Sequence, residues 1–220
     1  MSCTLTVKLR FLDLICGFTM LVRFSISSFR LNADGLDRLG KCVCSYVYNT
    51  NGQRRLVVGG NTDSLYKNRF WFSEPNNLGY IPDVNYAFFG ESTSGIIGLG
   101  SVGDYLAVFK DSLEIHSTVG LFSVGNMESG TSYLSYFKSV ASLQASPLIA
   151  PRSINYLNGE LLYLSNDGIN AITLVNNSSE RASVKRSYYL DGKLNAETME
   201  NRKNAIATIY RNKYVLLVNN

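Results

Sequence analysis

Short apolar runs that follow a glycine or asparagine turn recur along the chain. The clearest copies span residues 103–111, 159–167 and 212–220, and a fainter copy spans residues 52–60. A spacing of roughly 50 residues is typical of β-propeller blades, each with about four strands that must pack on neighbouring blades. The pattern therefore predicts an all-β protein, a β-propeller-like array of about three to four short antiparallel blades.

The last copy stops after what would be the second strand of a repeat. Closed propeller rings usually have about four to eight blades, so we expect an incomplete or open array. We also expect the last strand pair, residues 205–218, to leave an unpaired edge or to meet another chain. Residues 31–220 are predicted to form the propeller domain, and residues 1–30 are either a partial blade or a non-native extension. Lys8, Arg10 and the apolar residues 11–22 also have the outline of a signal peptide.

The alternation in residues 68–73, Asn-Arg-Phe-Trp-Phe-Ser, indicates a strand that uses both of its faces. It places Phe70 and Phe72 on one face and Trp71 on the other, so we expect neighbouring blades to cover both sides. Residues 74–83 contain two prolines and several turn formers, which predicts a long connection. Three segments break the strand pattern: 120–138 is partly loop-like, 139–149 allows a brief helix before a proline, and 194–202 predicts a helix with an asparagine cap.

Composition supports the all-β prediction and excludes some functions. The chain has 18 Gly, 14 Tyr and 11 Phe but only 4 Pro, which suits short strands joined by glycine turns. The net charge of +4 is mild and the basic residues are scattered, so we expect no nucleic-acid groove. The apolar run at 11–22 is too short to span a membrane. Cys3, Cys16, Cys42 and Cys44 form no C-x-x-C pair, which favours buried thiols over a disulfide framework or a zinc site.

Candidate chemistry is sparse. The one histidine, His116, lies in an alternating segment that favours a packed or solvent-facing role, and any catalytic triad would have to use it. Glu74, Asp83 and Glu91 lie in or near the long connection, where a pair of acids could hydrolyse a glycosidic bond. Oxygen-rich turns at 61–63 and 166–168 could bind calcium, but neither has the ligand density of an EF-hand loop, so turn formation is the default explanation. We therefore predict no catalytic residues, no metal site and no cofactor.

Longer stretches of blade-like sequence occur at residues 68–75 (NRFWFSEP), 80–86 (YIPDVNY) and 96–110 (IIGLGSVGDYLAVFK), and continue at 150–154, 158–168 and 203–210. Together these segments resemble the β-propeller segments of tailed-bacteriophage virion proteins, of the tail nozzle, tail hub or head-to-tail stabilisation type. The resemblance covers about three quarters of the chain. It implies a non-enzymatic structural role in the virion, after synthesis in the bacterial cytoplasm. The partners that it implies are other tail subunits and further copies of the chain in a homo-oligomeric ring. It carries over no catalytic residues.

Two functional hypotheses follow from these observations. The first is a virion structural protein whose interaction loop, with Glu74, Tyr80, Asp83 and Tyr86, contacts neighbouring subunits. The second is a carbohydrate-binding or glycan-hydrolysing propeller, in which Trp71 and the two tyrosines stack on sugar rings while the two acids supply polar contacts. The second hypothesis requires these aromatic and acidic side chains to converge on one pocket.

Overall fold

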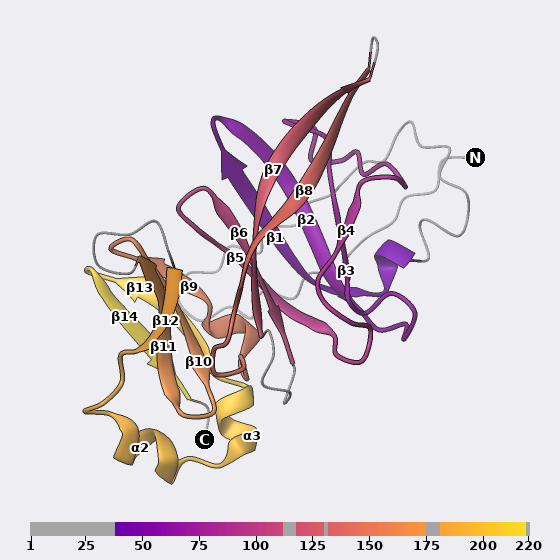
Figure 1. Cartoon of the computed structure of the whole chain (residues 1–220). Coiled ribbons are helices and arrows are strands. Elements are labelled where there is room, and N and C mark those ends of the chain that lie inside the picture. The colour runs from indigo at the N-terminus through magenta and orange to yellow at the C-terminus, as the bar shows by residue number, and fades with distance from the viewer. Residues whose placement is uncertain (1–37, 112–117, 130–131, 175–180, 219–220) are drawn as a thin grey trace, which may run out of the picture.

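The computed structural model describes residues 38–111, 118–129, 132–174 and 181–218, which form four antiparallel sheets (Figure 1). The first sheet contains β1 (Cys42–Thr50), β2 (Gln53–Asn61), β3 (Arg69–Phe72) and β4 (Tyr86–Phe88), and the second contains β5 (Ile96–Val102), β6 (Tyr105–Lys110), β7 (Val119–Ser129) and β8 (Ser132–Leu143). The third contains β9 (Asn155–Leu157), β10 (Glu160–Ser165), β11 (Gly168–Leu174) and β12 (Arg181–Lys185), and the last contains β13 (Ile206–Tyr210) and β14 (Lys213–Leu217).

In every sheet, strands that are neighbours in the sequence are also neighbours in the sheet. This meander is the strand order of a propeller blade. None of the sheets closes on itself, and the described residues make three full blade-like sheets and one hairpin. The predicted open all-β array of three to four blades is confirmed.

Two-residue turns explain why the sequence repeat begins where it does. Each sheet joins its first two strands by such a turn, at Asn51–Gly52, Gly103–Asp104, Asn158–Gly159 and Arg211–Asn212. In three of the four turns both central residues have positive φ, for example 50° at Asn51 and 74° at Gly52. Such turns match the right-handed twist of the flanking strands and favour asparagine and glycine. The repeat is therefore a repeat of hairpins.

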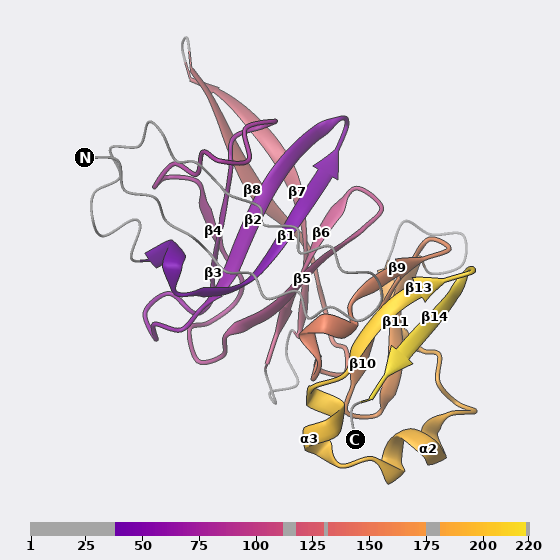
Figure 2. The ribbon, with the colours of Figure 1, turned by 180° about the vertical axis from the view of Figure 1, so that it is seen from behind.

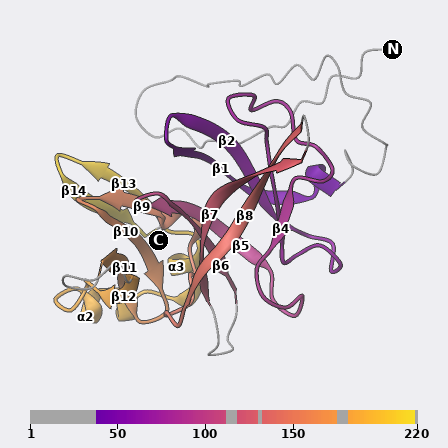
Figure 3. The same ribbon diagram turned by 45° about the horizontal axis from the view of Figure 1, so that its top comes forward.

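The sheets stack one after another, and each pair of successive sheets shares an apolar core. The first strands of successive sheets contact one another, β1 with β5, β5 with β9, and β9 with β13. Figure 3 shows the second sheet between the first sheet and the last two. The first core includes Tyr48, Phe70 and Phe122, and the second includes Phe109 and Tyr163. A third core joins the third sheet to the final hairpin.

Glycines in β5 allow the second and third sheets to approach closely. A Cβ at Gly98 would lie 2.6 Å from Leu148 Cδ2 and 2.7 Å from Ile154 Cδ1. A Cβ at Gly100 would lie 3.0 Å from Ile154 Cγ2. The glycine-rich segment at 98–103 is thus a packed strand with its turn.

Two of the less regular segments are wholly or partly strands, and the sequence pattern left the first of them ambiguous. Residues 120–129 and 132–138 belong to the long strands β7 and β8, which project beyond their neighbours in Figure 1. Gly125 gave that segment its loop-like appearance, but it pairs with Tyr136, whose ring lies where a Cβ would be. The brief helix at 139–149 was a wrong prediction, because β8 continues to Leu143 and pairs there with Val119 of β7.

The predicted helix at 194–202 is two short helices, α2 (Asp191–Ala196) and α3 (Met199–Lys203), which lie beside the last two sheets (Figure 2). Thr198 separates them. Its backbone is extended, and its Oγ1 accepts a hydrogen bond from the Asn201 N–H at 3.2 Å, so it is the N-cap of α3. The asparagine cap was therefore predicted at the wrong residue. No helix in the described ranges is long and apolar enough to cross a membrane.

Candidate functional site

The two acidic side chains of the predicted interaction loop have different surroundings. Glu74 Oε1 accepts a hydrogen bond from Asn85 Nδ2 at 2.8 Å, and Asn85 is buried. Asp83 instead lines a recess beside Arg38 that has no room for a water molecule. The two carboxylates thus have different neighbours, which does not favour a pair that hydrolyses a glycosidic bond.

The predicted aromatic surfaces are also separated by burial. Trp71 is only 4% exposed, and Tyr66 packs against it with ring centroids 6.3 Å apart. Phe70 and Phe72 are buried on the opposite face, as the alternation predicted. Tyr80 is exposed on the connection, whereas Tyr86 lies on β4. Since Trp71 offers no open ring face, it is not available to stack on a sugar.

Other candidates from the sequence have structural roles or lie outside the described residues. Asn61 Oδ1 accepts the Asp63 N–H at 2.8 Å, and Asp167 accepts the Asn170 side chain at 2.9 Å, so both oxygen-rich turns bond internally. Cys42 and Cys44 are free and partly buried, and burial raises the pKa of each thiol to about 12. His116, Cys3 and Cys16 lie outside the described residues. In the described ranges no three His, Cys, Asp or Glu side chains gather as metal ligands would.

The outer face of the first sheet carries four exposed apolar side chains. We call it the first outer face, and it comprises Val43, Val47, Tyr86 and Phe88. Directly paired residues lie on the same face of a sheet, and side chains alternate between the two faces along each strand. The pairs Val47–Leu56, Val58–Trp71 and Trp71–Tyr86 therefore point outward, while the pairs between them, such as Val57–Phe72, point into the first core. Their exposed fractions range from 40% for Tyr86 to 70% for Val43.

An arginine lies among the aromatic rings at the margin of the first outer face. The Arg69 guanidinium carbon is 4.7 Å from the Phe88 ring centre, 4.8 Å from that of Tyr66 and 5.2 Å from that of Tyr86. Cation–π contacts of this kind hold rings in place on a partly hydrated surface. The first outer face is therefore an ordered apolar surface with aromatic residues, a composition typical of the cores of protein interfaces.

A second apolar face occurs at the other end of the array. We call it the last outer face, and it comprises Ile206, Tyr210, Val215 and Leu217. The pairs Ile206–Leu217 and Thr208–Val215 point outward, while the alternate pairs Ala207–Leu216 and Ile209–Tyr214 point toward the third sheet. Within the described residues, β14 pairs with β13 alone, which agrees with the predicted unpaired edge.

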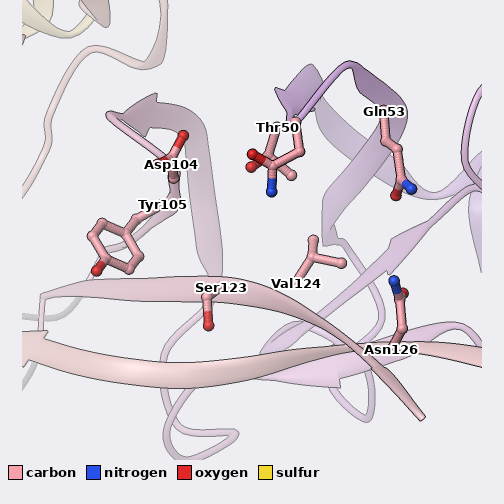
Figure 4. Close-up of a pocket in the computed structure, with 8 residues that line it drawn as sticks. Thr50, Gln53, Asp104, Tyr105, Ser123, Val124 and Asn126 are labelled. Carbon is pink, nitrogen blue, oxygen red and sulfur yellow. The ribbon is translucent and has the colours of Figure 1, made fainter. Parts of the chain in front are cut away.

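A polar cleft of about 310 Å³ opens between the first and second sheets (Figure 4). Three hairpins line it: β1–β2 with Thr50, Asn51 and Gln53, β5–β6 with Asp104 and Tyr105, and β7–β8 with Ser123, Val124 and Asn126. The sequence analysis missed this cleft. Its residues are far apart in the sequence and meet only because the two sheets stack, so no local pattern indicates it.

Arg55 lies beneath the cleft in a position that the strand alternation assigns to the core. Its side chain is 0% exposed, and Val57 on the same face of β2 is equally buried. Burial lowers the pKa of Arg55, although the charge of Glu74 acts in the opposite direction. The sequence alone made no prediction for Arg55 beyond its place among scattered basic residues, so its burial is a finding of the structure.

The chain matches no protein-family model and no curated protein. The described residues define an open, blade-like all-β array with exposed apolar side chains on two end faces and a polar cleft between its first two sheets.

Proposed function

We propose that the chain is a non-enzymatic structural module of a tailed-phage virion, in which stacked blades associate with neighbouring subunits of a tail or head-to-tail ring. The observation that carries this proposal is the pair of apolar end faces on the array. The resemblance of its blade segments to those of virion propellers supports the setting. The burial of Trp71, the lack of room in the recess that it shares with Asp83, and the different neighbours of Glu74 and Asp83 weigh against the pocket that a glycan-hydrolysing propeller would need.

The two end faces differ from each other, which determines the kind of assembly that they allow. The first outer face presents Val43, Val47, Tyr86 and Phe88, and the last outer face presents Ile206, Tyr210, Val215 and Leu217. Contact between two different surfaces is heterologous and generates a closed ring or an open filament. Because successive sheets within the chain already stack through apolar faces, a second copy could continue the same stacking. The expected partner is therefore another copy of this chain, joined head to tail.

Light scattering on the purified chain at several concentrations tests the assembly. We expect a discrete oligomer, and we expect Val47→Glu to dissociate it because the substitution places a charge among the exposed apolar side chains of the first outer face. Val140→Glu on β8 is the matched control, since Val140 and Val47 are both 49% exposed. A wild-type chain that stays monomeric at about 100 μM, more than ten times a micromolar dissociation constant, would refute head-to-tail assembly. Equal dissociation of both variants would refute the assignment of the face.

The virion setting has its own test, which is independent of the assembly. Particles released from the bacterium that encodes the chain can be purified and analysed by mass spectrometry. We expect peptides from residues 38–218 in intact tailed particles, at a copy number consistent with a ring. Their absence from particles, with the protein present in the cell lysate, would refute the virion role while leaving the assembly result unaffected.

A further inference from the structure

The polar cleft has a buried cation behind it, Arg55, on which the charge of Glu74 acts without a direct ion pair. The described residues contain no ion pair that includes Arg55. Its guanidinium donates instead to neutral acceptors, namely the Ser73 carbonyl at 3.3 Å, Gln53 Oε1 at 3.3 Å and Ser135 Oγ at 3.0 Å, and its Nε has no partner. A fully buried guanidinium is normally paired with a carboxylate, because its desolvation is otherwise poorly compensated.

The hydrogen bonds of Arg55 fix the orientation of two amides that line the cleft. Arginine can only donate, so Gln53 must turn its carbonyl oxygen toward the guanidinium and its NH₂ group away. Ser135 Oγ accepts from Arg55 and therefore gives its own proton to Asn126 Oδ1, 3.2 Å away, which leaves the NH₂ group of Asn126 for another acceptor. Figure 4 shows the Gln53 and Asn126 side chains pointing toward each other at one side of the cleft.

This side of the cleft is a donor site for an anion. Gln53 and Asn126 both line the cleft, and because their amide oxygens are bonded to Arg55 and Ser135, their NH₂ groups remain as donors, polarised through hydrogen bonds that lead back to a buried positive charge. The opposite side carries the exposed carboxylate of Asp104, which accepts hydrogen bonds and repels anions. A ligand that fits both sides has a carboxylate at one end and hydroxyl groups at the other.

We infer that the cleft binds a small hydroxylated carboxylic acid, the chemistry of a sugar acid. Its carboxylate accepts hydrogen bonds from Gln53 and Asn126 and compensates the charge of Arg55. Its hydroxyl groups donate to Asp104. The cleft volume of about 310 Å³ is at the lower end of the range for small-molecule sites, which suits one such unit. This site is separate from both end faces and does not depend on the proposed virion role.

Titration of the full chain with sodium glucuronate at low ionic strength, followed by calorimetry or by amide chemical shifts, tests the inference. We expect saturable binding, and we expect glucose, which lacks the carboxylate, to bind at least about tenfold more weakly. Failure of glucuronate to bind at concentrations up to about 50 mM, well beyond the weak millimolar range, would overturn the inference. Equal binding of glucose would also overturn it, since the charge would then have no role.

Gln53→Glu supplies the decisive variant. The new carboxylate can pair with Arg55 and replaces a donor by a negative charge, so the variant should fold while glucuronate binding falls at least about tenfold. Asn126→Asp should have the same effect from the other amide. Gln144→Glu makes the same change at an exposed position away from the cleft and should leave binding unchanged. Unchanged binding in Gln53→Glu, or an equal loss in Gln144→Glu, would contradict the assigned donor side.

Discussion

Phe137 on β8 joins the first two sheets, and its removal tests whether they form one cooperative unit. The side chain is 8% exposed and belongs to the first core. Its ring centre lies 4.7 Å from that of Phe72, 5.6 Å from that of Phe70 and 5.6 Å from that of Tyr48. All three neighbouring rings come from the first sheet, so Phe137 contributes to the contact between sheets more than to its own sheet.

The cost of Phe137→Ala can be estimated from its burial. Truncation of a buried phenylalanine costs about 3–5 kcal/mol, because transfer free energy is lost and a cavity remains. The three ring contacts each contribute about 0.5–1.5 kcal/mol and are part of that loss. For a domain of this size each kcal/mol lowers the melting temperature by about 2–4 °C, so we expect a decrease of roughly 6–20 °C.

Urea unfolding followed by tyrosine and tryptophan fluorescence measures this effect, and Tyr136→Ala is the matched control. Tyr136 is the adjacent aromatic residue, but it is 39% exposed and points away from the first core. Its loss should cost about 1 kcal/mol or less, as for a cross-strand pair on a hydrated face. If both variants lose the same stability, or if Phe137→Ala loses less than about 1 kcal/mol, the first two sheets are not packed through this core.

Two further predictions concern close packing and buried ionisable groups. Gly98→Ala should destabilise the fold by about 1–3 kcal/mol because its Cβ would overlap Leu148 and Ile154. The control Gly192→Ala in α2 has open space around its Cβ and should be neutral or stabilising. Equal urea midpoints for the two variants would contradict the packing of β5. Burial raises the pKa values of Cys44 and Tyr163 to about 12, and both groups ionise at lower pH in the unfolded chain. The free energy of unfolding should therefore be constant below about pH 9 and fall as the pH rises toward about 12. A melting temperature that stays constant from pH 8 to pH 11 would show that these groups are not buried.

The turns and strands could be predicted from sequence because their causes are local. Positive φ at Asn51 and Asn158 selects asparagine next to glycine, and this constraint is visible in the residues themselves. The alternation around Trp71 likewise predicted its face correctly. The β7–β8 hairpin was less clear, since Gly125 weakens strand propensity and only the ring of Tyr136 across the ladder compensates for it.

The candidate sites could not be predicted in the same way, because they depend on contacts between distant segments. Glu74 is in an acidic loop by sequence, but its partner Asn85 can be identified only once the connection has folded back. Arg55 is adjacent to another arginine and resembles a solvated strand end, yet the stacking of β8 on β2 buries it against Ser135. Side-chain burial and amide orientation are properties of the stacked sheets.

The stacking order of the cores has a consequence for how the array gains and loses structure. Each core joins sheets that are adjacent in the sequence, so stability is approximately a sum of nearest-neighbour terms, as in a one-dimensional lattice. Among the described sheets, the second and third have a neighbour on each side, while the first sheet and the final hairpin have one. Thermal fluctuations should therefore open the array from its end faces inward, and the surfaces offered to partners are also those with the lowest local stability.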